Sequence, residues 1–356
     1  MIDSVLKKYH ENQTFPGVVL LIEKSGKIVK SSILGDAQTT PKNLPMKEET
    51  LFDLASVTKS LATTTTFLAL CELNAIGFDK TAGYFIPELN TKTGALSLFQ
   101  LMTHTSGLPP IPGIFTLFKT ADEVDMVKGL SHLYSLIPDQ TPGTGVIYSC
   151  TGYIILTRIL EKVAGCSLSK AFADLITTPG NLNDLFFNPK VETGDRERCA
   201  ATEYCSWRGR MVKGEVHDEN SFCFNGEGGN AGLFGTAKSV MDLLNLFTSE
   251  GVLNRKQLLS PENIIGMTTC QTPDFSPKRA LGFLTQDTDS LAGPGFSNGA
   301  FGHTGFTGTS VWVDPEMKLK VVTLTNRVHF GRDNTAEKIK LFRRELHQAI
   351  LKEFSE

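Results

Sequence analysis

The chain has 356 residues, of which 40% are hydrophobic and 21% charged, and its formal net charge at pH 7 is −3. This composition is typical of a globular protein, and the length suits one large domain or two intimately packed ones. Lysine and arginine are scattered along the chain, which argues against a basic nucleic-acid surface or a polybasic membrane patch.

Seven cysteines are present, an odd number, and no C-x-x-C pair occurs. We therefore expect free thiols in a reducing compartment and no metal site. Residues 1–10 lack the apolar core and cleavage site of a signal peptide, and no stretch approaches the ~18 apolar residues of a membrane-spanning helix. The chain as given is expected to be cytoplasmic, or periplasmic or secreted if a leader was removed.

The first elements are predicted from β-rich runs and from a helical pattern. Residues 16–35 are expected to form a hairpin around a Ser25-Gly26 turn. A helix is predicted from Ser56 to about Ala75. It contains four consecutive threonines, at 63–66, which are poor formers of an exposed helix, so we expect this part to be buried.

A helical period dominates residues 60–250. Gly- and Pro-rich loops at 108–113 and 142–145 separate the helical segments and are expected to form walls rather than flexible linkers. The apolar stripes of the region are Leu98, Leu101 and Met102; Ile155, Leu156, Ile159, Leu160 and Val163; and Met241, Leu243, Leu244 and Phe247.

The last hundred residues return to strands. Strands are predicted at 280–284, 309–313 and 319–325, with a turn at 314–318 between the last two and a closing amphipathic helix at 334–354. Strands at both ends of the chain predict one sheet built from both ends, with a helical region inserted between them.

Ser56 and Lys59 carry the strongest chemical signal. Their spacing places both side chains on one face of the predicted helix, one turn apart. An amine held against a hydroxyl can take its proton, so Ser56 could act as a nucleophile without a histidine. The helix N-terminus adds a positive field. To accept that proton, Lys59 would need a pKa lowered by burial or by positive neighbours.

Two downstream segments complete a pattern, Tyr148-Ser149-Cys150 and His303-Thr304-Gly305. The first precedes a predicted helix at 151–163, and the second precedes the strand at 309–313. The order S-x-x-K, Y-x-N, K-T-G describes the serine β-lactamase and penicillin-binding-protein superfamily. The chain resembles the branch that holds class C β-lactamases, D-alanyl peptidases and related esterases.

Further segments extend the resemblance over most of the chain. They lie at 101–109, 216–220, 229–237, 303–308 and 324–328. The nearest subgroup resembles muramyl-peptide amidase-like enzymes.

The resemblance implies an α+β fold of the β-lactamase/transpeptidase type, an antiparallel sheet flanked by helices with an inserted mainly helical region. Residues 1–58 and 255–356 are assigned to the sheet region and residues 59–254 to the helical region. The two regions are expected to form one intimately packed unit with the active site between them.

The resemblance also assigns roles to residues. Ser56 is the expected nucleophile, while Lys59 and Tyr148 are expected to move protons. The backbone N–H groups of Ser56 and Phe306 would form an oxyanion hole. Gly305 is expected to let a substrate approach the strand closely.

The substrate-binding set implied by the resemblance is Cys150, Thr304 and Gly305, and His303 joins the catalytic set. His303 stands where many relatives have lysine. A histidine is mostly neutral near pH 7, so it offers no fixed charge to a substrate carboxylate. This favours substrates without a carboxylate beside the scissile bond.

Cys150 stands where the family usually has asparagine. A thiol is a weak hydrogen-bond partner. Three interpretations are open, namely an altered substrate contact, reduced activity, or a redox-sensitive site, and we favour the first. Cys150 is not the expected nucleophile, because Ser56 already has a helix terminus and a lysine.

These observations predict acyl-serine hydrolysis of an amide in a peptidoglycan-derived or D-amino-acid-containing substrate. The alternatives are a carboxylesterase of small acyl esters, a true β-lactamase or D-Ala-D-Ala carboxypeptidase, and a catalytically weak binding protein. The expected partner is a small-molecule or peptide substrate and not a nucleic acid, and the oligomeric state is not predicted. No H-E-x-x-H, G-x-G-x-x-G or P-loop pattern occurs, and we expect no cofactor.

Overall fold

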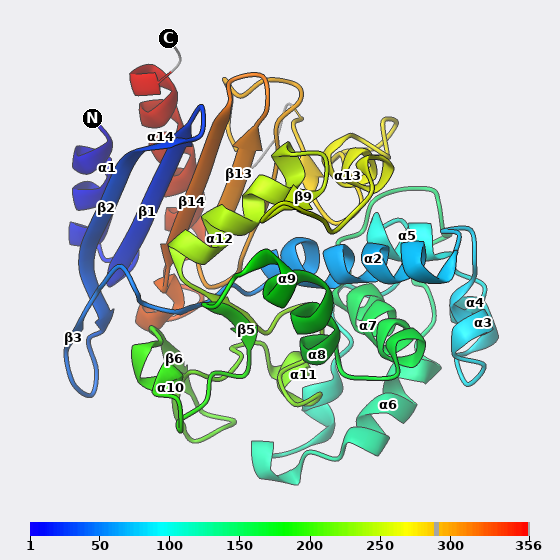
Figure 1. The fold of residues 1–356 in the computed structure, drawn as a ribbon. Helices are drawn as coiled ribbons and strands as arrows, with labels where there is room; N and C mark the ends of the chain where they lie inside the picture. The colour runs from blue at the N-terminus through cyan, green and yellow to red at the C-terminus, as the bar shows by residue number, and fades with distance from the viewer. Residues whose placement is uncertain (288–291, 355–356) are drawn as a thin grey trace.

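The computed structural model describes residues 1–287 and 292–354, and both ends of the chain supply strands to one large sheet (Figure 1). The strands of this sheet are β1 (Gly17–Lys24), β2 (Lys27–Gln38), β3 (Leu44–Pro45), β11 (Leu284–Thr285), β12 (Phe301–Thr304), β13 (Ser310–Asp314) and β14 (Leu319–Thr325). Their order is β11-β12-β13-β14-β1-β2-β3, and every neighbouring pair is antiparallel. The expected fold class, an antiparallel sheet with helices, is confirmed.

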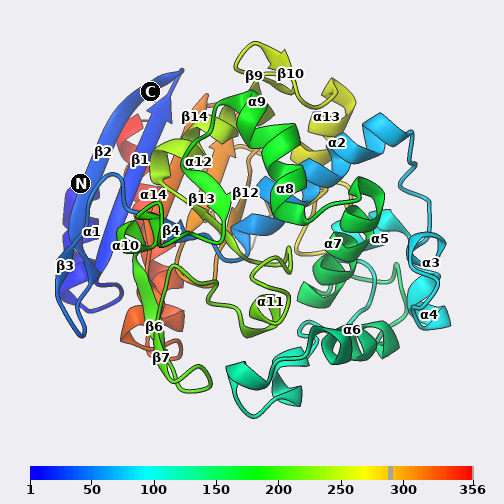
Figure 2. The same ribbon diagram turned by 60° about the horizontal axis from the view of Figure 1, so that its bottom comes forward.

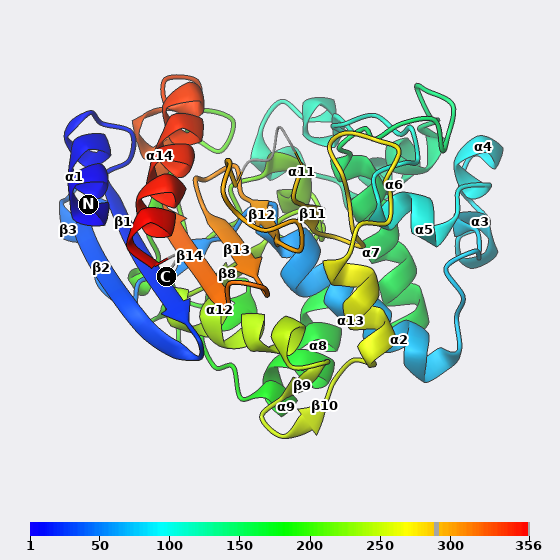
Figure 3. The same cartoon turned by 90° about the horizontal axis from the view of Figure 1, so that it is seen from above.

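Helices cover both faces of the sheet (Figure 3). Helices α1 (Ile2–Glu11) and α14 (Ala336–Phe354) lie side by side on one face, and α12 (Ala237–Leu244) lies on the other face against β1 and β14. The sequence of β1 explains why both faces can be covered. Its residues Gly17 to Glu23 are all buried, and alternate side chains face opposite layers.

The remaining helices build the larger part of the molecule beside the sheet (Figures 1 and 2). They are α2 (Thr65–Asn74), α3 (Ala82–Phe85), α4 (Thr91–Gly94), α5 (Leu98–Met102), α6 (Met126–Ser135), α7 (Cys150–Ala164), α8 (Leu168–Phe172), α9 (Thr178–Gly180), α10 (Asp195–Arg198), α11 (Glu219–Phe222) and α13 (Pro261–Thr268). The expected apolar stripes fall on α5, on α7, and on α12 with the turn that follows it.

Short strands also occur within the region expected to be helical. They are β5 (Leu185–Phe187), β6 (Ala201–Cys205), β7 (Arg210–Lys213), β8 (Leu233–Gly235) and β9 (Val252–Leu253). Strand β9 pairs with β10 (Lys256–Gln257), which lies just beyond this region. Strand β4 (Phe52–Asp53), just before Ser56, pairs with β8, which in turn pairs with β5. The division of the chain into a sheet region and a helical region stays a prediction.

Several predicted elements match the structure. The hairpin of β1 and β2 turns at Ser25-Gly26, and the strand predicted at 319–325 is β14. The four threonines at 63–66 are fully buried, as expected. The helix that contains them runs through a π-helical segment, Lys59–Thr64, before α2, and this irregularity was not predicted.

The strand predicted at 280–284 is wrong except for its last residue, Leu284. Residues 280–283 form a tight turn in which the Ala280 N–H donates to the Phe283 carbonyl. Gly282 has a φ of +87°, which a strand cannot use. Strand β12, which carries His303, and helix α1 were not predicted from the sequence.

No helix in the described residues 1–287 and 292–354 is long and apolar enough to span a membrane.

Candidate active site

A tight turn between β4 and the following helix presents Ser56. Ala55 has a φ of +47°, an uncommon conformation for a residue with a side chain. The Asp53 carboxylate accepts the Ala55 N–H at 2.8 Å, and the Leu54 N–H donates to the Leu233 carbonyl at 2.9 Å. These bonds hold the strained turn and leave the Ser56 side chain partly exposed.

Lys59 lies one helical turn after Ser56, as the spacing predicts. Its side chain is fully buried, and its Nζ lies 3.3 Å from Ser56 Oγ, 3.4 Å from Cys150 Sγ and 2.7 Å from the Asn230 carbonyl oxygen. An ammonium group has three N–H donors, and these three contacts use all of them.

The environment of Lys59 does not give it the lowered pKa that the proton-acceptor role requires. Burial lowers the pKa of Lys59, but negative charge on Cys150 and on Tyr148 raises it, and the net direction is upward. The Tyr148 ring lies 4.8 Å from Nζ and supplies a further favourable contact for a cation. Lys59 is therefore best described as an ammonium group in the folded chain.

Tyr148 lies two residues before α7, which begins at Cys150, and is positioned by His104. The imidazole of His104 lies 4.6 Å from the Tyr148 ring, and its Nδ1 accepts the Ser149 N–H at 3.0 Å. Ser149 caps α7 by accepting the Gly152 N–H at 3.1 Å. The Tyr148 hydroxyl is buried beside Lys59 and has no other hydrogen-bond partner among the described residues.

Cys150 is the first residue of α7 and is partly exposed. Its sulfur faces Lys59, with Sγ 3.4 Å from Nζ. The thiol cannot donate and accept as an amide does, so it contributes a weaker and less directional contact.

The turn after β12 is tied directly to the nucleophile segment. The hydroxyls of Thr307 and Thr309 donate to the carbonyls of Asp53 and Leu54 at 2.8 and 3.0 Å. A Cβ on Gly305 would lie 2.6 Å from the Leu54 carbonyl oxygen. The glycine thus permits close contact between these two protein segments, which is a different reason from the expected approach of a substrate.

Phe306 is anchored in a way that leaves its N–H unused. Its carbonyl accepts a hydrogen bond from Arg327 Nε at 2.8 Å, and its ring stacks on His217 at 5.6 Å. Within the described part of the chain, the N–H groups of Ser56 and Phe306 donate no hydrogen bond. Two free N–H groups beside a nucleophile are what an oxyanion hole requires.

His303 is buried on β12, and its ring lies 6.1 Å from the Tyr148 ring. Its Nδ1 lies 2.8 Å from the Thr304 carbonyl oxygen, which can only accept, so Nδ1 carries the proton and Nε2 has a lone pair. Burial, followed by the charges of Arg279 and Lys59, lowers the pKa of His303 well below the usual value. The neutral state expected from the sequence agrees with this direction.

A cavity of about 370 Å³ connects these groups. Its lining residues are Ser56, Tyr148, Arg279, Leu284, His303, Thr304, Gly305, Phe306, Arg327, Ala336, Ile339, Lys340 and Arg343. Of the eight residues predicted for the site, six line this cavity, while Lys59 and Cys150 lie behind it in contact with each other.

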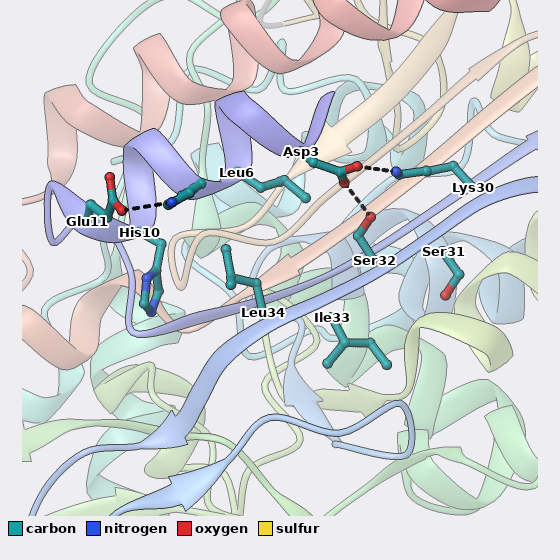
Figure 4. A pocket seen from close by; sticks show the side chains of 10 residues that line it. Asp3, Leu6, His10, Glu11, Lys30, Ser31, Ser32, Ile33 and Leu34 are labelled. Atoms are coloured by element: carbon teal, nitrogen blue, oxygen red, sulfur yellow. Dashed lines mark hydrogen bonds and ion pairs between the residues drawn. The ribbon is translucent and has the colours of Figure 1, made fainter. Parts of the chain in front are cut away.

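A second cavity lies on the surface between α1 and β2 (Figure 4). An ion pair between Asp3 and Lys30 at 2.6 Å and a hydrogen bond from Ser32 to Asp3 at 3.2 Å cross it. The Ser32 hydroxyl donates to a carboxylate that Lys30 already pairs, and none of the eight residues predicted for the site lines this cavity.

The Beta-lactamase family model matches residues 2–343, nearly the whole chain. The chain belongs to the Beta-lactamase family. As a member of it, the chain is a serine hydrolase.

A curated relative and two solved structures resemble the chain over most of its length. The N-acetylmuramyl-L-alanine amidase of Bacillus subtilis (strain 168) is 29% identical over 345 residues, covering 88% of this chain and 78% of that protein. The class C β-lactamase of Rhodobacter sphaeroides has a similar fold, with a TM-score of 0.72, 20% identity, and coverage of 98% of this chain and 99% of that one.

A second similar structure is EstCE1, described as a hydrolase with promiscuous acyltransferase activity. It has a TM-score of 0.74 and 21% identity, and the match covers 96% of this chain and 97% of that chain. At these identities, the two structural similarities show a shared fold and nothing further.

Sequence reasoning missed two groups of the site. The Asn230 carbonyl contacts Lys59, and Asn230 lies in the 229–237 segment that was noted only as a resemblance. Arg279 lies on an irregular loop, and no motif or period marks it. Only the tertiary structure places its guanidinium 5.2 Å from the Tyr148 ring.

Proposed function

We propose that this serine hydrolase is an amidase that cleaves an amide bond in a peptidoglycan-derived or D-amino-acid-containing substrate. The observation that supports the chemistry is the 3.3 Å contact between Lys59 Nζ and Ser56 Oγ at the cavity. The substrate class is supported by the similarity to the amidase of Bacillus subtilis.

Ser56 Oγ attacks the amide carbonyl and forms a covalent acyl-serine. The carbonyl oxygen becomes an oxyanion bound by the N–H groups of Ser56 and Phe306, where one such donor is worth about 3 kcal/mol. The serine proton passes to the Lys59–Tyr148 pair and then to the leaving amine as the C–N bond breaks. Water then attacks the acyl carbonyl and loses a proton to the same pair. The bond between the acyl carbon and Ser56 Oγ breaks, the pair returns a proton to Ser56 Oγ, and the acid leaves.

Tyr148 is the proposed base of this pair. A protonated Lys59 cannot accept a proton, so we assign the relay to Tyr148, whose hydroxyl oxygen takes the serine proton as its own proton passes to the leaving group. The Lys59 charge, with its Nζ 4.8 Å from the Tyr148 ring, stabilises the negative charge that develops during this transfer. The two residues therefore act together on the proton that the reaction moves.

A carboxylesterase for small acyl esters is the second candidate. The neutral state of His303 favours it, because this strand position then offers no cation to a carboxylated substrate. A true β-lactamase or D-Ala-D-Ala carboxypeptidase would more commonly use a lysine there. A weak binding protein has only the Cys150 substitution in its favour.

A panel of muropeptides, D-Ala peptides, p-nitrophenyl esters and nitrocefin separates these candidates. We expect measurable amide hydrolysis with a muropeptide or D-amino-acid peptide, and loss of turnover by several orders of magnitude in Ser56→Ala. A fluorophosphonate should label the peptide that carries Ser56. Hydrolysis that survives in Ser56→Ala would exclude the mechanism, and turnover of esters alone would favour the second candidate.

A further inference from the structure

His217 lies between the two segments that carry the proposed oxyanion donors. Its backbone N–H donates to Asp53 Oδ2 at 2.6 Å, and the other oxygen of the same carboxylate accepts the Ala55 N–H. Its imidazole stacks on the Phe306 ring, with the ring centroids 5.6 Å apart and the planes inclined by 23°. One residue therefore contacts both the turn that presents Ser56 and the residue that supplies the second N–H donor.

The position of His217 is fixed by three separate parts of the chain. Asp53 accepts its N–H, and Arg208 Nη2 donates to its carbonyl at 3.1 Å. Its Nε2 lies 2.8 Å from Glu203 Oε1, and the side chains of His217 and Glu203 are both buried. The first two contacts hold the backbone, so Glu203 is the group that holds the imidazole ring.

Glu203 is an anion with two cationic or polar partners. Burial raises the pKa of Glu203, but hydrogen bonds from His217 and Arg332 lower it, and the net direction is downward. An ionised carboxylate only accepts hydrogen bonds, so His217 Nε2 carries a proton and donates it to Glu203. Arg332 Nε donates to Glu203 at 2.8 Å, and Arg332 Nη2 donates to Glu219 at 2.8 Å. This network fixes the plane of the imidazole on which the Phe306 ring stacks.

The Phe306 ring is the part of the oxyanion segment that needs support. The backbone on either side of its N–H is held, because the Gly305 carbonyl accepts Arg343 at 3.0 Å and the Phe306 carbonyl accepts Arg327 Nε at 2.8 Å. The ring itself is apolar, and Phe306 is 47% exposed. An oxyanion donor works only within ~2.7–3.1 Å of the oxyanion, so a displaced ring that shifts this turn would weaken it.

We propose that Glu203 and His217 are positioning residues of the oxyanion hole. Together they hold the Phe306 N–H in register with that of Ser56. Glu203 fixes the imidazole, the imidazole supports the Phe306 ring, and Asp53 ties the same histidine to the nucleophile turn. Neither Glu203 nor His217 belongs to the described lining of the cavity, so they act through Phe306 and not on the substrate. The inference rests on the proposed function in taking these two N–H groups as the oxyanion hole.

Two esters that differ in one atom test the proposal. Attack of Ser56 on p-nitrophenyl benzoate creates an oxyanion, whereas attack on the thionobenzoate, with sulfur in place of the carbonyl oxygen, creates a sulfur anion that accepts hydrogen bonds weakly. The rate of acylation is measured from the burst of nitrophenolate or by single turnover. His217→Ala should slow acylation by the benzoate about tenfold to a hundredfold and by the thionobenzoate less than about threefold, since loss of one whole donor costs ~10²–10³.

Three further variants control this experiment. His217→Phe keeps a ring against Phe306 but cannot donate to Glu203, so it should retain part of the benzoate preference, and it keeps the test decisive if His217→Ala folds poorly. Glu203→Gln should lose less of the preference than His217→Ala, because a neutral amide oxygen still accepts from His217. Glu23→Gln is the matched control, since it breaks a comparably buried ion pair, Glu23–Lys320 at 2.8 Å, outside the described lining of the cavity.

The ratio of the two acylation rates separates positioning from stability. Glu23→Gln should lower Tm and leave the benzoate-to-thionobenzoate ratio at the parental value. If His217→Ala and His217→Phe slow both esters in the same proportion, His217 contributes only to stability and the proposal is overturned. A parental ratio in both His217→Phe and Glu203→Gln would overturn the role of Glu203.

Inhibition by phenylboronic acid separates failure of this inference from failure of the proposed function. Ser56 Oγ adds to boron and loses its proton, which gives a tetrahedral anion with an oxygen at the oxyanion position, and no amide is cleaved. His217→Ala should weaken inhibition about tenfold or more, and that result supports the inference even if no amide proves to be a substrate. Inhibition equal to that of the parent overturns the inference even if the enzyme is an amidase. A parent that neither ester acylates and that binds no boronate would refute the inference and the proposed function together.

Discussion

The Nζ of Lys59 lies 3.4 Å from the Sγ of Cys150. This contact places a thiol, at the start of α7, beside the ammonium that also contacts the nucleophile. Negative charge on Cys150 is the largest of the influences that raise the pKa of Lys59, after burial, which lowers it. The residue at position 150 therefore influences the pKa of Lys59.

Replacing Cys150 by asparagine should keep or raise activity on amides. The substitution removes an ionisable group beside Lys59, so the pKa of Lys59 should fall, and it restores an amide that can donate and accept. The measurement is kcat/KM for an amide substrate from pH 6 to 10. A loss of activity of tenfold or more would show that the thiol itself contributes to turnover.

Alkylation of the parent with iodoacetamide should slow turnover, because Cys150 is partly exposed and a bulky group there would reach the site. Cys150→Ala serves as the control, since its turnover should resist the same treatment while Ser56 still reacts with a fluorophosphonate. If Cys150→Ala has parental activity and the parent is insensitive to alkylation, Cys150 lies outside the functional site.

Replacing Lys59 by glutamine should reduce turnover by several orders of magnitude, because Ser56, Lys59 and Tyr148 are expected to act as one unit. The hydrogen bond to the Asn230 carbonyl can be kept by the glutamine amide, which limits the effect on folding. Single-turnover acylation measures the effect at the first chemical step. A deficit below tenfold would assign the proton transfer to another group.

Replacing His303 by lysine should shift preference toward β-lactams and other carboxylated substrates. The added ammonium would stand near Arg279, and one charged hydrogen bond is worth about tenfold or more. We expect the ratio of kcat/KM for nitrocefin to that for p-nitrophenyl acetate to rise at pH 8. Because the pKa of His303 is well below 6.5, the pH–rate profile of the parent should show no inflection from His303 near pH 6.5.

Efficient nitrocefin hydrolysis by the parent, with both rates unchanged in His303→Lys, would contradict this prediction. His303 would then not set the substrate class, and the β-lactamase interpretation would replace the amidase proposal.

His347 is expected to make the fold less stable in acid. Burial lowers its pKa to about 4, so between pH 6.5 and 4 the unfolded chain binds more protons than the folded one. The free energy of unfolding should therefore fall as pH falls, by up to about 1.4 kcal/mol per pH unit from this residue. His347→Asn keeps a donor to the Ala292 carbonyl and should remove that part of the slope.

Urea unfolding of parent and variant at pH 8, 6 and 5 measures the effect. The pH 8 values provide the baseline, because His347 is neutral there in both states. Parallel pH dependences in the two proteins would show that His347 does not titrate as its burial requires.

Local sequence information was sufficient for the features that depend on neighbouring residues. The Ser56–Lys59 spacing, the turn at Ser25-Gly26 and the strand at 319–325 follow from side-chain periodicity and turn chemistry, which act within a few residues. The same rules misassigned residues 280–283, because an apolar run is compatible with both a strand and a buried turn. They gave no signal for the π-helical segment at Lys59–Thr64.

The tertiary structure decided everything that depends on contacts between distant segments. Arg279 reaches Tyr148, the Asn230 carbonyl reaches Lys59, and Gly305 fits against Leu54 only because the chain brings separate segments together. The sequence could identify Lys59 as a candidate proton carrier, but not the direction of its pKa. That direction depends on the balance between lost hydration and nearby charges, and both are set by burial and distance in the folded chain.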